Sequence, residues 1–133
     1  MSTTLKDNSK FYTFPLPSSG AILIFMLNLL KDYDLKHDAL SYHRIAEVFK
    51  FAYARRSQLG DEPSDEIKEV MTNLTNQQYA DEIKKLINDE RTSDDVEYYG
   101  AKYENQIDQG TAHLSILMPN GDAIAATATI NYK

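Results

Sequence analysis

Apolar positions change their spacing near residue 110, and this change divides the chain into two parts. Before it, apolar residues recur every three or four positions or fill whole stretches, which is typical of helices. After it, apolar and polar residues alternate, which is typical of strands that cover a core on one side. The pattern predicts an α+β fold, with mostly helices in residues 18–88 and a β-hairpin in residues 111–131.

The first predicted helix is apolar on almost every side. Residues 14–17 contain two prolines and are expected to be extended, and Ser18 or Ser19 then caps a helix that runs to about Tyr33. Its apolar run, Ala21–Leu30, is shorter than the roughly 20 residues that a transmembrane helix needs. A helix that is apolar all round belongs in the core of something large, so we expect part of the protein to lie outside this chain.

Three further helices are predicted before residue 88. The second runs from about Ser41 to Leu59 and ends at Gly60, the third is short and begins at Pro63-Ser64, and the fourth opens on the capping-box pattern of residues 75–78. Positions at helical spacing in the second are Ile45, Phe49, Ala52, Arg56 and Leu59, with Val48 and Tyr53 beside them. The apolar stripe of the fourth is Tyr79, Ala80, Ile83, Leu86 and Ile87.

A long acidic segment separates the helices from the strands. Residues 88–109 show no clear period and carry far more acidic than basic side chains. Loops longer than about 12–15 residues are usually functional or disordered. The segment ends where the strands begin, which is where a processing protease or a self-cleaving fold needs slack.

The turn between the two strands decides which side chains face each other. A two-residue turn at Asn120-Gly121 places Thr111 opposite Ile130, which sets a polar face against an apolar one. A three-residue loop at Pro119-Asn120-Gly121, with glycine in a G1 bulge, places Thr111 opposite Thr129 and His113 opposite Thr127. We favour the second register because both faces then match, and it brings the two threonine hydroxyls within hydrogen-bonding reach.

Composition narrows the possible functions. The chain has 133 residues, which fits one domain, and its net charge of −6 argues against a nucleic-acid binder and against attraction to anionic lipid. It has no cysteine, which excludes disulfides, thiolate catalysis and zinc–thiolate sites. The polar first ten residues show no targeting signal, so we expect any such signal to lie outside this chain.

Thr111 is the residue whose chemistry stands out. It follows Gly110 at the start of the first strand, and from these residues alone an ordinary strand opening is the favoured interpretation. If the chain were cut before Thr111, however, its hydroxyl would be a nucleophile and its own α-amine the general base. The choice between the two depends on the rest of the chain.

Several segments together resemble the γ-glutamyltransferase family, whose members are also called γ-glutamyl transpeptidases or glutathione hydrolases. The resemblance runs from about Phe14 to Asn131, in the family's order and spacing. The segments that carry it are Pro17-Ser18-Ser19-Gly20, Leu27-Asn28-Leu29-Leu30, Tyr42-His43-Arg44-Ile45-Ala46-Glu47, Phe51-Ala52-Tyr53-Ala54-Arg55-Arg56, Leu59-Gly60-Asp61, Gly110-Thr111-Ala112-His113-Leu114-Ser115 and Ala126-Thr127-Ala128-Thr129-Ile130-Asn131.

The resemblance implies a part of an N-terminal-nucleophile hydrolase, an αββα sandwich of two sheets between helical layers. Residues 1–110 correspond to the C-terminal part of the large-subunit region, including an acidic linker at 89–110. Residues 111–133 correspond to the start of the small-subunit region. A fragment of this kind spans the subunit junction and is expected to associate with the missing subunit parts.

The resemblance also implies roles for individual residues. The precursor cuts itself at the Gly110–Thr111 bond, and Thr111 then attacks the γ-glutamyl amide of glutathione or another γ-glutamyl compound. Water, an amino acid or a peptide accepts the acyl group, with no cofactor and no metal. Thr129 orients the nucleophile, and Asn131 helps to bind the α-amino group of the glutamate. Members of the family act at the outer face of the plasma membrane, or as secreted or periplasmic enzymes.

The chain departs from the family in ways that bear on activity. It is several times shorter than the family's enzymes, and it contains no Gly-Gly pair of the kind that forms their oxyanion hole. Because each oxyanion donor is worth about 10²–10³ in rate, we predict that this chain alone is inactive. The alternative is a non-catalytic, truncated paralogue that binds a partner through Ala21–Leu30 and its open strand edges. An incomplete gene model is a third possibility.

Four other features have modest interpretations. Asn73-Leu74-Thr75 is a glycosylation acceptor motif, which also arises by chance. His43 and Glu47 lie four residues apart, but two residues make no metal site, and we predict a solvated or salt-bridged pair. His113 is interpreted as a packing and hydrogen-bonding residue. The Arg55-Arg56 pair is interpreted as surface or inter-helix ion-pair partners.

Overall fold

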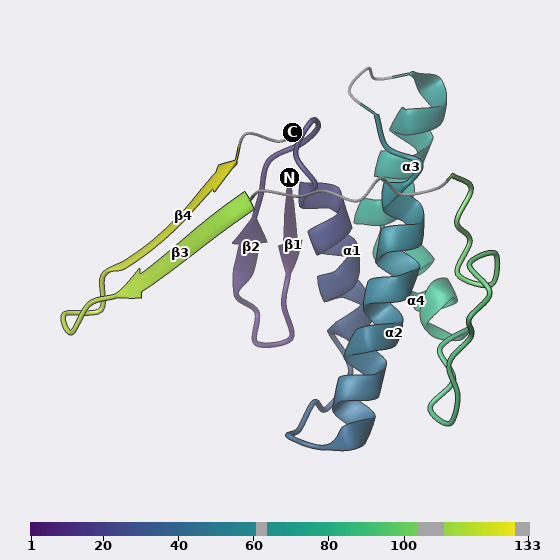
Figure 1. Cartoon of the computed structure of the whole chain (residues 1–133), viewed down its shortest axis with the longest axis horizontal. Helices are drawn as coiled ribbons and strands as arrows, with labels where there is room; N and C mark the ends of the chain where they lie inside the picture. Colours follow the sequence, from purple (N-terminus) through teal and green to yellow (C-terminus); the bar gives the residue numbers. More distant parts are fainter. Residues whose placement is uncertain (61–63, 104–110, 130–133) are drawn as a thin grey trace.

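The computed structural model describes residues 1–60, 64–103 and 111–129 of the chain. Over these residues it contains two small antiparallel sheets and four helices (Figure 1). The elements are β1 (Ser2–Thr4), β2 (Lys10–Tyr12), α1 (Gly20–Leu30), α2 (Ala39–Arg56), α3 (Asp65–Thr75), α4 (Gln77–Lys84), β3 (Thr111–Leu117) and β4 (Ala123–Thr129). The α+β class is confirmed, whereas the αββα sandwich stays a prediction.

Helix α1 is the centre of the helical body. It packs against α2, α3, α4 and β1, which explains why its sequence is apolar on almost every side. Phe25 and Leu29 of α1 are fully buried with Phe51 of α2 and Leu74 of α3. The expectation of a core helix is therefore confirmed within this chain, although Leu23 remains exposed.

The N-terminal strands were not predicted from the sequence. Residues 1–10 were predicted only to be polar, but β1 and β2 form a hairpin in which Ser2 pairs with Tyr12. Its role is to satisfy a polar group in the core. Asn28 of α1 is buried, and its side-chain oxygen accepts a hydrogen bond of 2.6 Å from the hydroxyl of Thr3.

Local capping moves several helix ends away from the predicted positions. Helix α1 ends at Leu30 rather than Tyr33, and Ser19 is its N-cap residue but makes no side-chain cap hydrogen bond. Helix α2 begins at Ala39, earlier than expected, because the carboxylate of Asp38 accepts a hydrogen bond of 2.8 Å from the amide of Ser41. It ends at Arg56, after which the chain continues in tight turns.

The predicted capping box at the fourth helix was wrong by one residue. Helix α3 ends at Thr75, whose hydroxyl donates back to the carbonyls of Met71 and Thr72. Asn76, with an extended backbone at φ −90° and ψ 122°, both ends α3 and caps α4. Its side-chain oxygen accepts a hydrogen bond of 2.8 Å from the amide of Gln78. The two helices therefore share a single cap residue.

The predicted buried face of α2 was partly wrong. Phe49 and Tyr53 are exposed, whereas Phe51 and Glu47 are buried. The reason is that α2 has two neighbours, α1 on one side and the acidic segment on the other (Figure 1). The ring of Phe51 meets the ring of Tyr99 edge-on, with 4.9 Å between their centroids. A single apolar stripe in the sequence predicts only one buried face for a helix, whereas α2 has two.

The described part of the acidic segment, residues 88–103, packs against α2 and is not the loose loop that the sequence predicted. Tyr99 from this segment is among the buried residues of the core. Tyr98 contacts the Tyr99 ring edge-on at 5.0 Å, and its hydroxyl donates to the carbonyl of Leu86. Residues 104–110, the rest of the predicted linker, lie outside the described residues.

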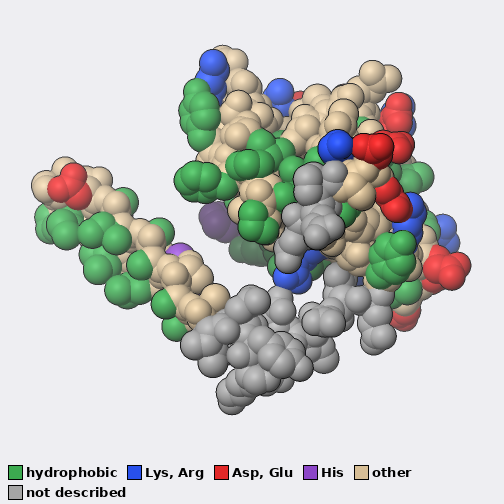
Figure 2. All heavy atoms as spheres, turned by 90° about the horizontal axis from the view of Figure 1, so that it is seen from above, with side chains coloured by type: hydrophobic (Ala, Val, Ile, Leu, Met, Phe, Trp, Pro, Cys, Tyr) green, Lys and Arg blue, Asp and Glu red, His purple; other side chains and the backbone are tan. Residues whose placement is uncertain are grey.

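The C-terminal hairpin has the register that facial matching predicted. Thr111 pairs with Thr129, His113 with Thr127 and Ser115 with Ala125. The loop is the predicted three-residue one: the amide of Gly121 donates to the carbonyl of Met118, and Gly121 has a φ of +91°. Every residue of both strands is exposed, and the hairpin extends from the body as an arm (Figures 1 and 2).

None of the helices in the described ranges combines the length and the apolarity needed to cross a membrane.

We expect Asn76→Ala to lower the free energy of unfolding by about 1 kcal/mol, because α4 loses its cap. Thr75→Ala removes only hydrogen bonds to carbonyls of the preceding turn and should cost clearly less. Urea unfolding monitored by circular dichroism measures both. A larger loss for Thr75→Ala than for Asn76→Ala would contradict this assignment of the cap.

Candidate active site

The two threonines singled out by the sequence lie opposite each other on β3 and β4. The hydroxyl of Thr111 donates a hydrogen bond of 3.0 Å to the hydroxyl oxygen of Thr129. Antiparallel pairing places both side chains on one face of the hairpin, so the bond follows directly from the register. The predicted contact between Thr111 and Thr129 is confirmed.

A polar face continues along the hairpin from this pair. One ring nitrogen of His113, Nδ1, lies 2.6 Å from the hydroxyl oxygen of Thr127, and the other, Nε2, lies 2.8 Å from that of Ser115. Both ring nitrogens therefore have hydroxyl partners that can donate or accept. This agrees with the interpretation of His113 as a hydrogen-bonding residue. It leaves the Thr111 hydroxyl bonded to Thr129 rather than to the imidazole.

The opposite face of the hairpin is apolar and open. Leu114 is 58% exposed, Ile116 41% and Ile124 51%. Figure 2 shows these hydrophobic side chains gathered along the arm, away from the helical body. The hairpin is therefore amphipathic. Its polar face is available for chemistry, and its apolar face can be buried only by packing against another part of the protein or another chain.

Two of the predicted site residues cannot be placed. Gly110, on the upstream side of the predicted cleavage point, and Asn131, the predicted contact to the substrate's amino group, lie outside the described residues. Their roles stay predictions. Acidic and histidine side chains of the described ranges do not gather in threes at distances suited to a metal ion.

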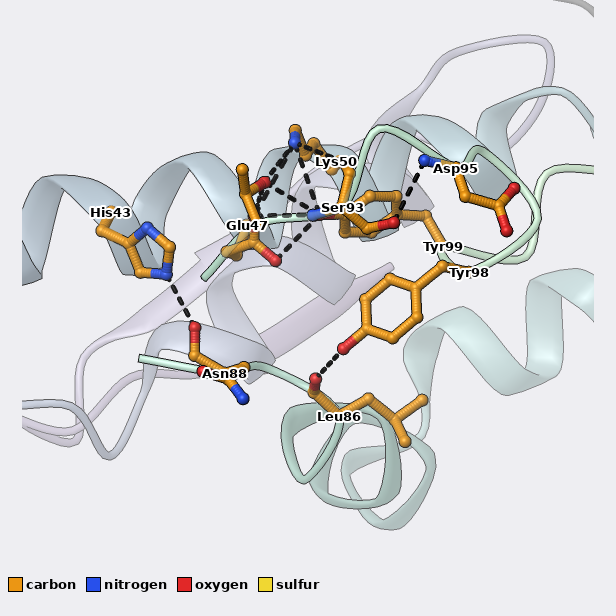
Figure 3. Close-up of polar contacts among 10 residues, drawn as sticks. His43, Glu47, Lys50, Leu86, Asn88, Ser93, Asp95, Tyr98 and Tyr99 are labelled. Carbon is orange, nitrogen blue, oxygen red and sulfur yellow. Dashed lines mark hydrogen bonds and ion pairs between the residues drawn. The ribbon is translucent and has the colours of Figure 1, made fainter. Parts of the chain in front are cut away.

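The sequence missed a second polar cluster, which is built around Glu47 on α2 (Figure 3). The Glu47 side chain is only 2% exposed. Its carboxylate accepts from the hydroxyl of Tyr99, which lies 3.0 Å from each oxygen, and from the hydroxyl of Thr92 at 2.6 Å. The ammonium of Lys50 lies 3.8 Å from one of the oxygens. A buried carboxylate is stable only when it is paired in this way.

The predicted pair of His43 and Glu47 was therefore wrong. Glu47 is buried, and its partners are Lys50, Tyr99 and Thr92 rather than the imidazole. His43 instead donates from Nε2 to the carbonyl of Asn88 at 2.7 Å (Figure 3). His43 and Glu47 each form a hydrogen bond to the acidic segment, but to different residues of it. A helix-face pattern cannot show this, because the partners lie more than 40 residues away.

Arg44 and Asp89 form a further link between α2 and the segment. The guanidinium of Arg44 donates to both carboxylate oxygens of Asp89, at 2.8 and 2.6 Å. This hydrogen bonding holds the pKa of Asp89 below its ordinary value of 3.8 and raises the pKa of Arg44. The bidentate geometry is the one that guanidinium and carboxylate groups favour.

Arg55 and Arg56 occupy different environments. Arg55 donates to the backbone carbonyl of Tyr99 and, from Nε, to the hydroxyl of Tyr79 at 3.2 Å. Arg56 lies over the ring of Tyr53, with its guanidinium 5.9 Å from the ring centroid. The predicted ion-pair role did not anticipate the contacts of Arg55 with tyrosines of α4 and of the acidic segment.

Asn73 lies in the last turn of α3 and is partly exposed. The hydroxyl of Thr75, the third residue of the acceptor motif, bonds to backbone carbonyls of α3. Glycosylation at Asn73 stays a prediction.

The sequence of the chain matches a known protein family. The family model described as Gamma-glutamyltranspeptidase matches residues 1–133. The chain therefore belongs to the γ-glutamyltranspeptidase family.

The chain is much shorter than the relatives that it matches. It is 39% identical over 129 residues to Scoloptoxin SSD14 of Scolopendra dehaani, which covers 91% of this chain and 22% of that protein. It is 38% identical over 122 residues to Glutathione hydrolase 2 of Arabidopsis thaliana, covering 88% of this chain and 21% of that protein. With Glutathione hydrolase 5 proenzyme of Rattus norvegicus, it is 33% identical over 133 residues, covering 93% and 23%. The chain thus spans about a fifth of the length of these relatives.

The Arg44–Asp89 pair should make the docking of the acidic segment sensitive to acid. A lowered pKa means that the pair stabilises the fold fully above pH 3.8 and that this contribution is lost as the pH falls through the lowered folded-state pKa. Protection factors of the amides near Asp89, which correct hydrogen exchange for its intrinsic pH dependence, should therefore fall only in that acidic range. Asp89→Asn should show faster exchange already at neutral pH and a weaker acid response; an unchanged profile would contradict the role of the pair.

Proposed function

We propose that this chain is the nucleophile-bearing part of an enzyme that transfers the γ-glutamyl group of glutathione and hydrolyses γ-glutamyl compounds. The observation that carries the proposal is the hydrogen bond of 3.0 Å from Thr111 to Thr129, on the polar face of the hairpin. Membership of the γ-glutamyltranspeptidase family supports it, as do relatives named glutathione hydrolase. On this proposal, Thr111 is the nucleophile and Thr129 is the residue that orients it.

The nucleophile is released by cleavage of the Gly110–Thr111 bond in the full-length precursor that the proposal requires. The hydroxyl oxygen of Thr111 adds to the carbonyl carbon of Gly110, the C–N bond breaks, and the nitrogen takes up a proton. The resulting ester is hydrolysed by water, which leaves a carboxylate on Gly110 and a free α-amine on Thr111. This amine has an ordinary pKa of about 7.7–8.0, which suits a general base near neutral pH.

The catalytic cycle then uses the same hydroxyl. The α-amine of Thr111 takes the hydroxyl proton as the oxygen attacks the γ-glutamyl carbonyl carbon, and the departing amine receives a proton. A γ-glutamyl ester forms, and water, an amino acid or a peptide accepts the acyl group. Asn131 contacts the α-amino group of the glutamate. An extracellular or periplasmic setting, at the plasma membrane or secreted, belongs to the same proposal.

The 133-residue chain by itself is proposed to be inactive. Its sequence contains no Gly-Gly pair to donate hydrogen bonds to an oxyanion, and loss of such donors costs about 10²–10³ in rate for each. The exposed apolar face of the hairpin also supports the absence of activity; Leu114, Ile116 and Ile124 lie on it. Catalytic side chains must be held in place by residues packed behind them, and this face of the hairpin is not packed against anything in the described residues.

The exposed apolar face also favours the second candidate function, a non-catalytic interaction module. A truncated paralogue that uses this face and its open strand edges to bind another protein chain needs no free α-amine. Light scattering separates the candidates in part: a strictly monomeric chain counts against the interaction module.

Release of Thr111 is the direct test of the enzymatic proposal. Intact mass and N-terminal sequencing of the full-length precursor should reveal a chain that begins at Thr111, and Thr111→Ala should abolish both that chain and the release of a chromogenic anilide from a γ-glutamyl substrate. The purified 133-residue chain should give no measurable anilide release. A precursor that stays uncut, or turnover by the short chain, would each refute the corresponding part.

The role of Thr129 has a separate test. Thr129→Val should lower kcat by up to about 100-fold, because the Thr111 hydroxyl loses the partner that orients it. Thr129→Ser keeps a hydroxyl at the same register and should retain most of the activity. Equal kcat values for the valine and serine variants would show that the hydrogen bond does not orient the nucleophile.

A further inference from the structure

The loop between β3 and β4 contains an Asn-Gly pair, Asn120-Gly121, at the outer end of the arm (Figure 1). An asparagine followed by glycine loses its side-chain amide readily, because glycine has no side chain to keep its backbone nitrogen away from the asparagine. The residues of the loop are exposed, and a Cβ on Gly121 would meet none of the described atoms within 4 Å. Water and space for the reaction are therefore available at this loop.

The reaction needs only water. The backbone nitrogen of Gly121 bonds to the side-chain carbon Cγ of Asn120 and gives up its proton, while the bond from Cγ to Nδ2 breaks and that nitrogen leaves with the proton as ammonia. Water then opens the resulting succinimide ring at one of its two carbonyl carbons. One opening leaves aspartate at residue 120, and the other leaves isoaspartate, whose main chain is longer by a methylene group.

The folded loop holds both groups that have to react. The amide of Gly121 donates to the carbonyl of Met118 at 3.0 Å, so the attacking nitrogen is already engaged. The side chain of Asn120 is bound at both ends by Asp122. Its Oδ1 accepts a hydrogen bond of 3.1 Å from the Asp122 amide, and its Nδ2 donates one of 2.8 Å to the Asp122 carboxylate. We call these two bonds the Asn120–Asp122 clamp.

Ring closure competes with all three hydrogen bonds. Cγ of Asn120 changes from planar to tetrahedral when the Gly121 nitrogen bonds to it, which moves Oδ1 and Nδ2 relative to Asp122. The nitrogen itself must leave the carbonyl of Met118. Since each hydrogen bond shifts an opening equilibrium by roughly two- to tenfold, the closed loop should lose ammonia more slowly than an open one.

The loop also determines the pairing at the candidate active site. The amide of Met118 donates to the carbonyl of Asp122 at 2.8 Å, and from there the register continues along both strands to Thr111 opposite Thr129. Loop length and turn type fix the register of a hairpin. A methylene group added to the main chain at residue 120 lengthens the loop on which this register depends.

We propose that Asn120 is a site of spontaneous deamidation, that the Asn120–Asp122 clamp sets its rate, and that isoaspartate there loosens the pairing of Thr111 with Thr129. The proposal does not depend on the proposed function, because it concerns the register of the hairpin and not the chemistry of Thr111. Chains kept at neutral pH then become a mixture, in which one fraction carries isoaspartate and a loosened hairpin.

The first measurement is the rate of ammonia loss at residue 120 in the 133-residue chain, followed by peptide mapping during incubation at neutral pH. Asp122→Ala removes the acceptor for Nδ2 and should raise the rate about three- to tenfold. Asp122→Asn restores an acceptor oxygen and should bring the rate to within about twofold of the wild type.

Ser115→Ala is the matched control. It removes a hydrogen bond of 2.8 Å to His113 on the same hairpin and leaves the loop unchanged, so it should react at the wild-type rate. In concentrated urea, where the clamp is absent, all four chains should react alike and faster than the folded wild type. Equal rates for the folded wild type and Asp122→Ala would overturn the role of the clamp. Equal acceleration by Ser115→Ala would do the same, since the stability of the whole hairpin would then set the rate.

The effect on the pairing of the strands is measured separately. The isoaspartate form is isolated by chromatography and compared with Asn120→Asp, whose main chain has its normal length. Protection factors of the amides in β3 and β4 should fall about tenfold or more in the isoaspartate form and should stay within about threefold of the wild type in Asn120→Asp. Equal protection in the two would overturn the effect on the pairing of Thr111 with Thr129.

Discussion

The buried carboxylate of Glu47 is the constraint on which the arrangement of this chain depends. A charge removed from water must be compensated by hydrogen bonds and an opposite charge, and the compensating groups here are Tyr99, Thr92 and Lys50. Two of these groups belong to the acidic segment. Burial of Glu47 therefore requires the segment to lie against α2, where the rings of Phe51 and Tyr99 also meet.

The contrast between the helical body and the hairpin follows from how each satisfies its apolar surface. The body surrounds α1 with three helices and a strand and buries Phe25, Phe51 and Leu74 completely. The hairpin leaves its apolar face open while its polar face is internally hydrogen-bonded, from Thr111–Thr129 to His113. One part of the chain thus has a core of its own, and the other has a surface suited to being covered.

The sequence predicted the hairpin better than the helices, and the reason is physical. A turn and two alternating faces determine register, so Pro119-Asn120-Gly121 was enough to pair Thr111 with Thr129. Helix ends depend on single side chains. Asp38 and Asn76 are the N-cap residues, although neighbouring residues have a similar propensity for capping. The chemical role proposed for Thr111 was predicted from the family resemblance, because the register alone gives only its hydrogen-bond partner. The environment of Glu47 had no local signal, because its partners Thr92 and Tyr99 are distant in sequence.

Gly100 gives the acidic segment an uneven tolerance to sequence drift. Most of the segment's acidic side chains point into water, where exchange among polar residues changes little. At residue 100 the guanidinium of Arg55 occupies the place of any Cβ, and the left-handed backbone adds a second penalty for every other residue. Across a lineage, the exposed acidic positions of the segment can therefore vary widely, whereas residue 100 is expected to stay glycine for as long as the segment packs against Arg55.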